Sequence, residues 1–260
     1  MTAGGFELRQ EDLDREAARF GAADDQVRRD HAISHILGAI SSHLRQDVIF
    51  FGGTALSRTH LVHARLSEDI DLIARGKRSQ IANRLVSAIN MALLRPYGRL
   101  SWSPSLTTHD VEPAIIETAT GLSIRVQLLD KHGYQPWPTE LRDIEQRYQD
   151  APPATLIVPT IESFVGWKTT AWHMRGASRD LYDLWALAQA GAITAKAADL
   201  FAKHGTTGNR PSEFIFAKAP SQEQWQASLS GQTRLEVTAA EALAVVRNAW
   251  ASALGENWPS

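Results

Sequence analysis

The sequence predicts an α+β protein, in which strands with flanking helices are followed by a mainly helical C-terminal half. Short apolar or alternating runs bounded by turn residues predict strands in the first half. Helical spacing of apolar residues dominates after Ala151-Pro152-Pro153, where we expect the boundary between residues 1–153 and 154–260. The expected strands are Val48–Phe51, Asp69–Ile73, Leu100–Leu106, Ala114–Glu117, Leu122–Leu129 and Thr155–Val158.

Helical periodicity places several helices between and after these strands. A short helix is expected around Glu11–Phe20, and a longer one from Asp25, whose apolar face runs from Ile33 to Leu44. Pro96 and Gly98 are expected to end the helix that starts at Arg78. Residues 131–153 are aromatic, charged and proline-bearing, and no strand is expected there. The expected helices are Glu11–Phe20, 25–44, Thr54–Leu61, Arg78–Leu94, Ile161–Arg175 and Ala239–Leu254.

Composition limits the classes of function. The 260 residues are 43% hydrophobic and 22% charged, which suffices for one large domain or two small ones. With 27 Lys and Arg against 29 Asp and Glu, the net charge of −2 gives no overall basic field, although a local basic surface remains compatible with it. The absence of cysteine excludes disulfides and thiolate chemistry. Zinc bound by histidine alone is compatible with the sequence, but we expect no His-x3-His pair on a helix face beside an acid. No signal peptide or membrane-spanning run is recognised, so a cytoplasmic protein is expected.

Residues 48–72 carry the first candidate site. The strand Val48–Phe51 stops at Gly52-Gly53, where backbone can approach a ligand closely, and helix-start amides after it can face a phosphate. The alternation in Asp69-Ile70-Asp71-Leu72 puts Asp69 and Asp71 on one face of a strand. Two neighbouring carboxylates repel each other unless a cation lies between them, and they suit a hard divalent ion that also holds phosphate oxygens. A glycine hairpin with two solvated aspartates is the alternative.

This stretch resembles the nucleotidyltransferase fold of the polymerase-beta type and, more narrowly, the AbiEii/AbiGii toxin family, which includes the mycobacterial MenT-type toxins. The Gly52-Gly53-Thr54-Ala55-Leu56 opening and the run from Arg65 to Leu72 carry the resemblance. It implies a small mixed nucleotidyltransferase sheet with flanking helices. Arg29-Asp30 stands where the family often has a Lys-Asp pair, with a solvated helix start as the alternative.

A second group of charged residues lies in the C-terminal half. Lys168-x-x-Ala171-x-x-x-Arg175 places a lysine and an arginine on one helix face, with a small residue between them. Arg179-Asp180-x-x-Asp183 follows after Gly176, and its two acids are adjacent on the next helix. Both runs are similar to motifs of the same family, except that Ala177 replaces a frequent lysine. Ion pairs within a helix hairpin are the alternative. The resemblance covers roughly residues 25 to 187 and leaves the last part unmatched.

The resemblance implies a reaction and roles for the residues. Asp69 and Asp71 would hold Mg²⁺ on the triphosphate of an NTP, while Gly52, Gly53, Thr54 and Ser67 would contact phosphate oxygens. Lys168, Arg175 and Arg179 would neutralise phosphoryl charge across a cleft, and Asp180 would orient Lys168 or accept a proton. Lys168→Ala is therefore expected to impair transfer with little effect on melting. The acceptor implied by MenT-type toxins is the 3′ end of tRNA, the effect is a block of translation, and the usual partner is an AbiEi-like antitoxin.

Several alternatives remain open. Gln127 occupies the place where such enzymes usually have a third carboxylate; Glu112 and Asp130 are possible substitutes, so one or two metals are compatible with the sequence. The acceptor could instead be a protein or small-molecule hydroxyl. A degenerate fold that binds nucleotide without catalysis is the rival from another class. Tryptophan side chains could stack on a base, although a place in the core is the stronger expectation. These are Trp102, Trp137, Trp167, Trp172 and Trp185.

Overall fold

The computed structural model describes residues 7–108, 113–132, 134 and 136–258. The chain divides into two compact units. Unit 1 comprises Met1–Tyr134 and Glu140–Val158, and unit 2 comprises Gln135–Thr139 and Pro159–Ser260. Within the described residues, no helix has both the length and the apolar character needed to cross a membrane.

Unit 1 is built on a mixed β-sheet. Within the described residues the sheet has seven strands, in the order β3-β4-β5-β2-β1-β7-β6. Strands β1 and β2 are antiparallel, whereas β2 pairs in parallel with β5 and β1 with β7. The central side chains Phe50, Leu72 and Val126 are fully buried, which fixes the register because a slip by one residue would expose them. The strands are β1 Val48–Phe51, β2 Asp69–Ala74, β3 Leu100–Ser103, β4 Ala114–Thr118, β5 Ser123–Asp130, β6 Thr139–Ile144 and β7 Ala154–Pro159.

The sequence prediction missed β6 altogether. This strand lies at one edge of the sheet and alternates exposed and half-buried residues until Ile144, so it lacks the apolar run that marks a central strand. The other expected strands are confirmed within a few residues. The largest difference is in β3, which ends at Ser103, whereas the expected strand ended at Leu106. The α+β fold with a mixed sheet is therefore confirmed.

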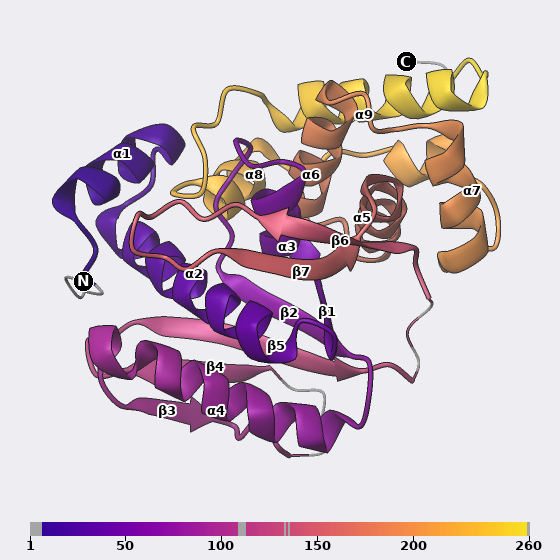
Figure 1. Ribbon diagram of the computed structural model, residues 1–260. Helices are drawn as coiled ribbons and strands as arrows, with labels where there is room; N and C mark the ends of the chain where they lie inside the picture. Colours follow the sequence, from indigo (N-terminus) through magenta and orange to yellow (C-terminus); the bar gives the residue numbers. More distant parts are fainter. Residues whose placement is uncertain (1–6, 109–112, 133, 135, 259–260) are drawn as a thin grey trace. The chain divides into compact units, whose positions relative to one another are not determined.

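Helices α2 (Asp24–Leu44) and α4 (Arg78–Tyr97) pack side by side along one face of the sheet (Figure 1). The buried residues of α2 include Ile33, Ile36 and Ile40, as the apolar spacing predicted. Helix α4 runs past its expected last residue, Leu94, and continues through Pro96 to Tyr97. Gly98 ends it, as expected, and the amide of Gly98 bonds to the carbonyl of Leu94. Helix α1 (Gln10–Phe20) packs on α2, and α3 (Gly52–Thr59) follows β1 without a loop.

Unit 2 is mainly helical. Thr160 caps α5 by accepting a hydrogen bond from the amide of Ser163, and Gly176 ends the helix with a left-handed backbone conformation. Helix α5 packs on α6 and α7, and α6 packs on α9. The predicted bounds of the first and last helices are confirmed. The helices are α5 Ile161–Arg175, α6 Ser178–Gln189, α7 Ala195–His204, α8 Gln222–Leu229 and α9 Ala239–Leu254, with a 3₁₀ turn at Glu213–Phe216.

A buried charged cluster joins three segments of unit 1. Asp30 on α2 accepts hydrogen bonds from Arg58 of α3 at 2.8 Å, from Arg147 at 2.9 Å and from the Tyr148 hydroxyl at 2.8 Å. Burial by itself would raise the pKa of Asp30, but Arg147 and Arg58 outweigh it and hold this pKa below its ordinary value. A solvated helix start, one of the two sequence interpretations, is therefore wrong for Asp30, which is only 2% exposed.

Replacing Asp30 with alanine should lower the free energy of unfolding by about 3–5 kcal/mol, because two guanidinium groups would stay buried without their carboxylate. Asp25→Ala removes an exposed acid from the same helix and should cost about 1 kcal/mol or less. Urea unfolding of both variants measures the difference. Equal losses would show that the Asp30 cluster adds nothing beyond ordinary helix-end electrostatics.

Candidate functional site

Gly52 and Gly53, the first two residues of α3, form a glycine turn at the end of β1 that packs directly against Asp71. Strand register pairs Phe51 with Asp71, so the glycine that follows Phe51 meets this carboxylate. Gly52 has a φ of 78°, and a Cβ atom built on it would collide with Oδ2 of Asp71. A side chain at Gly52 would thus be excluded twice, by backbone conformation and by lack of space. The space beside Gly52 holds the Asp71 carboxylate and has no room for a methyl group.

The second glycine of the turn faces a different pair of side chains. A Cβ atom on Gly53 would lie 2.9 Å from Nη2 of Arg65 and 2.9 Å from Oγ of Ser67. Arg65 is 3% exposed and donates a hydrogen bond to the carbonyl of Leu66. The Thr54 hydroxyl donates to the carbonyl of Asp69, which ties α3 to β2. The turn is therefore bordered by an ordered guanidinium group and a hydroxyl, and Thr54 could meet a phosphate only through its backbone amide.

Arg65 was not singled out as a site residue from the sequence. It lies in the run up to Leu72 that carries the family resemblance, but nothing in that run distinguishes a buried guanidinium beside the glycine turn from a solvated arginine. Only the long-range approach of Arg65 to Gly53 reveals its place.

Asp69 and Asp71 lie on the same face of β2, opposite the buried Ile70 and Leu72. Asp69 accepts a hydrogen bond from Arg125 of β5 at 3.1 Å, and both side chains are partly exposed, so water screens this pair. Gln127 is in register with Asp71 on the neighbouring strand. This part of the site thus has two carboxylates, one amide and one arginine along adjacent strands.

Asp130 and Glu112 were the possible substitutes for a third carboxylate. Asp130 is in register with Ala74, at the far end of β2 from Asp69, and its Oδ1 accepts a bond from the amide of His132. That position does not bring Asp130 beside Asp71. Glu112 lies outside the described residues.

Tyr134 borders the carboxylate pair and was not anticipated. Its ring lies 6.5 Å from that of Phe51, and burial together with the charge of Asp71 raises the pKa of its hydroxyl. The side chain is 39% exposed, so it forms part of the rim of this site. The segment that contains Tyr134 has no periodic pattern, and the sequence therefore gives no indication of its approach to Asp71.

The second group of predicted residues forms one ion-pair cluster in unit 2. Lys168 of α5 contacts Asp180 at 3.1 Å and Asp183 at 2.6 Å, both on α6. Arg175 donates to both oxygens of Asp180, from Nε at 2.6 Å and Nη2 at 2.9 Å. Both acids are buried, Lys168 is 8% exposed, and the Arg175 side chain is 63% exposed. Arg179, on the same helix as the two acids, is exposed.

This burial changes one expectation from the sequence. A lysine that projects freely into a cleft could be removed with little effect on melting, but Lys168 lies between two buried carboxylates. Its removal would leave these carboxylates with less compensating charge. The structure therefore leads us to expect a larger change in melting than the sequence suggested.

The tryptophans make intramolecular contacts. The rings of Trp137 and Trp167 stack with centroids 5.8 Å apart, and the ring of Trp185 lies 5.3 Å from that of Tyr182. Trp172 donates to the carbonyl of Ile215, and Trp102 donates to Asn90. Packing within the protein thus accounts for all five without a stacked base.

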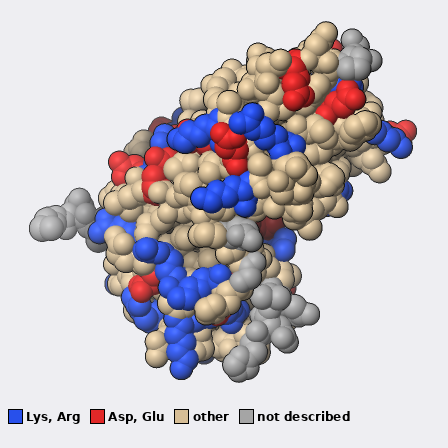
Figure 2. All heavy atoms as spheres, turned by 90° about the vertical axis from the view of Figure 1, so that its right-hand side faces the viewer, with Lys and Arg blue, Asp and Glu red and all other residues tan. Residues whose placement is uncertain are grey.

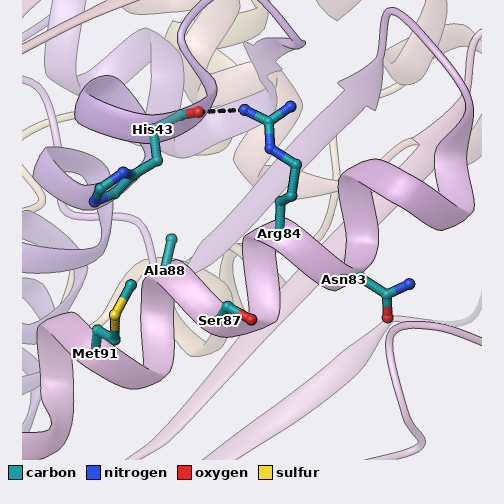
Figure 3. A pocket seen from close by; sticks show the side chains of 6 residues that line it. All are labelled: His43, Asn83, Arg84, Ser87, Ala88 and Met91. Carbon is teal, nitrogen blue, oxygen red and sulfur yellow. Dashed lines mark hydrogen bonds between the residues drawn. The ribbon is translucent and has the colours of Figure 1, made fainter.

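A separate hollow lies on unit 1 between the end of α2 and α4 (Figure 3). Arg84 reaches across it, donates to the carbonyl of His43 at 2.6 Å and pairs with Asp47 at 2.9 Å. None of the residues of the glycine turn or of the carboxylate pair lines this hollow. It provides no ligand set for a phosphate, and we assign it no part in the candidate site.

Comparison with known proteins identifies the class. The profile of the family described as nucleotidyl transferase AbiEii toxin, type IV toxin–antitoxin system, matches residues 35–254. A nucleotidyltransferase is thus the class of enzyme that this sequence and fold define. The chain belongs to the AbiEii toxin family and is a toxin-type nucleotidyltransferase of a type IV toxin–antitoxin system. A search of curated proteins gave no match.

Two solved structures share the fold. MenT4, a nucleotidyltransferase toxin from Mycobacterium tuberculosis, superposes with a TM-score of 0.72 at 21% identity, over 96% of this chain and 91% of that one. A proposed nucleotidyltransferase from H. pylori superposes with a TM-score of 0.53 at 14% identity, over 91% of this chain and 100% of that one. At these identities the comparisons establish the shared fold.

Gly52→Ala should disturb the site in two separable ways. The left-handed backbone costs alanine about 1–2 kcal/mol, and the new methyl group must displace the Asp71 carboxylate. Gly121→Ala is the matched control, because Gly121 has a φ of 85° but a Cβ there would have no atom of the described residues within 4 Å. Nucleotide affinity should fall only for Gly52→Ala, while both variants lose stability. Unchanged nucleotide binding by Gly52→Ala would make the turn purely structural.

Lys168→Ala should lower the free energy of unfolding by about 3–5 kcal/mol, because Asp180 and Asp183 would remain buried with less compensating charge. Lys196 provides a matched control, since it pairs with Glu162 at 2.7 Å but is 71% exposed. Its replacement by alanine should cost about 1 kcal/mol or less. Chemical unfolding of both variants tests the difference, and similar values would contradict a structural role for the Lys168 cluster.

Proposed function

We propose that the protein transfers a nucleoside monophosphate from an NTP to the 3′ hydroxyl of tRNA and thereby blocks translation. The acceptor oxygen forms a bond to the α-phosphorus, the bond to the β-phosphate oxygen breaks, pyrophosphate leaves, and the hydroxyl loses its proton. One observation carries the proposal. The Asp71 carboxylate packs against Gly52 of a turn that admits no side chain, and Asp69 lies on the same face of the same strand.

The donor set fits Mg²⁺. Asp69 and Asp71 offer hard carboxylate oxygens, both residues are partly exposed, and the absence of a side chain at Gly52 lets the Asp71 carboxylate lie directly against the backbone at the start of α3. Asp69 and Asp71 would hold the ion, which when bound would neutralise charge on the triphosphate. Gln127, in register with Asp71, carries a neutral amide in place of a third carboxylate, so this donor set favours one bound ion over two.

Residues around the turn would position the triphosphate. Backbone amides of Gly52, Gly53 and Thr54 at the start of α3 are suited to phosphate oxygens, because the first amides of a helix have no partner within it. Ser67 adds a hydroxyl beside Gly53, and Arg65 adds a guanidinium whose burial restricts its motion. An ordered donor stabilises developing charge without reorganisation during the reaction.

The charged cluster of unit 2 would supply cations to the phosphoryl group. Lys168, Arg175 and Arg179 are the candidates, and Lys168 and Arg175 are oriented by Asp180. Because Asp180 already accepts bonds from both of these cations, orientation is a better role for it than proton acceptance. Asp183 holds the other side of the Lys168 amine. The two acids fix the position of the Lys168 amine, and phosphoryl transfer relies mainly on positioned charges.

The choice of tRNA rests on the family rather than on a general attraction for nucleic acid, since the net charge is −2. Figure 2 shows Lys and Arg side chains in the lower half of the face that it draws, at the height of α4 and β3–β5, where a local attraction is available. Membership of a toxin–antitoxin family implies an antitoxin, for which we propose an AbiEi-like protein. An NTP donor and a tRNA acceptor would place the reaction in the cytoplasm.

Incubation with labelled NTPs, total tRNA and cell lysate should label tRNA at its 3′ end in a Mg²⁺-dependent reaction. Asp71→Asn should reduce this labelling by about 100-fold or more while the melting temperature changes little, because the carboxylate is partly exposed. Asp25→Asn removes an exposed acid elsewhere in unit 1 and should leave labelling unchanged.

The same experiment separates the rivals. Label found only in protein or in small solutes would contradict tRNA as the acceptor and retain the enzyme class. Binding of NTP without transfer to any acceptor, equal for the wild type and Asp71→Asn, would favour a degenerate nucleotide-binding protein, for which Gln127 is the best support.

A further inference from the structure

A cluster of two histidines and an aspartate lies in unit 1, outside the proposed nucleotide site. His31 and His35 are four residues apart on α2, and Asp150 reaches them from the segment before β7. Both histidines are buried, and the Asp150 side chain is 14% exposed. The sequence prediction that no such histidine pair faces an acid was wrong. The spacing of His31 and His35 was visible, but Asp150 is more than one hundred residues away in the chain.

The donor atoms of this cluster converge on one point. Nε2 of His31 lies 3.2 Å from Nε2 of His35 and 3.0 Å from Oδ2 of Asp150, and Nε2 of His35 lies 3.2 Å from the same oxygen. Ligand atoms bound at about 2.0–2.1 Å to a tetrahedral zinc ion lie about 3.3 Å from one another. The three atoms thus form nearly the triangle that one face of such an ion requires.

The contacts of Tyr97 fit the surroundings of a ligating histidine. Its hydroxyl lies 2.5 Å from Nδ1 of His31 and 3.3 Å from the carbonyl of Arg28. Tyr97 thus contacts the ring nitrogen of His31 that does not face Asp150, which leaves Nε2 for the cluster. In metal sites the second nitrogen of a ligating histidine usually has such an outer partner.

We propose that His31, His35 and Asp150 form a binding site for one zinc-class divalent cation. Two imidazoles and a carboxylate are a usual zinc set, and the Tyr97 hydroxyl at Nδ1 of His31 is the kind of outer partner that ligating histidines have in metal sites. A surface hollow lined in part by Arg28, His31 and Tyr97 borders one side of the cluster. The ion would join α2 to the segment that carries Arg147 and Tyr148.

The absence of cysteine from the chain allows a direct test. The 260-residue protein with Asp69→Asn and Asp71→Asn, which removes the proposed Mg²⁺ ligands, is loaded with Co²⁺ as a spectroscopic substitute for zinc. One equivalent should bind, with visible bands typical of tetrahedral coordination. His35→Cys should then add a near-ultraviolet thiolate-to-cobalt band. His43→Cys places the single cysteine at an exposed position of the same helix and should add none.

A second measurement covers the case in which His35→Cys fails to fold. Zn²⁺ should raise the melting temperature of the same background protein, and Asp150→Asn, which keeps the shape of the side chain, should weaken zinc binding by at least about tenfold. Absence of stoichiometric Co²⁺ or Zn²⁺ binding would overturn the proposal. A thiolate band of equal strength in His43→Cys, or unchanged zinc affinity in Asp150→Asn, would also overturn it. These readouts do not depend on nucleotide transfer, so they stand apart from the proposed function.

Discussion

The buried carboxylate of Asp30 is the interaction on which most of unit 1 depends. It accepts hydrogen bonds from Arg58 of α3 and from Arg147 and Tyr148, which lie in the segment before β7. Arg147 also donates to the carbonyl of Ser57. An isolated charge at this depth would be strongly unfavourable, so the three segments are stable only together. Because α3 begins at Gly52, the same cluster fixes the helix whose first residues form the glycine turn.

The two units place their charges differently. In unit 1, Asp69 and Asp71 are partly exposed on a strand, where a ligand can replace water around them. In unit 2, Asp180 and Asp183 are buried and already neutralised by Lys168 and Arg175. Acids of the first kind suit cation binding, whereas those of the second kind hold cations in place. Aspartate thus has two different roles in this protein, and the exposure of the side chain distinguishes them.

Local patterns predicted what depends on neighbours in the chain. The period of two in β2 placed Asp69 and Asp71 on one face, and the helical spacing gave the bounds of α5 and α9. Features that depend on distant contacts were missed. Arg65 approaches Gly53, and Asp150 approaches His31, through contacts that local patterns do not indicate. The edge strand β6 has too little apolar character to be recognised as a strand. Periodicity contains no information on which distant side chain closes a cluster.

The pair between Arg125 and Asp69 has a consequence for the order of binding. In the proposed site, Arg125 is an internal counterion that competes with any metal for the same carboxylate. If Asp69 held a metal ion, the guanidinium of Arg125 would be available to an anionic phosphate. The ion and the triphosphate would therefore each improve the affinity for the other, and by reciprocity neither would bind as well alone. Such coupling would keep the metal site weak until substrate arrives.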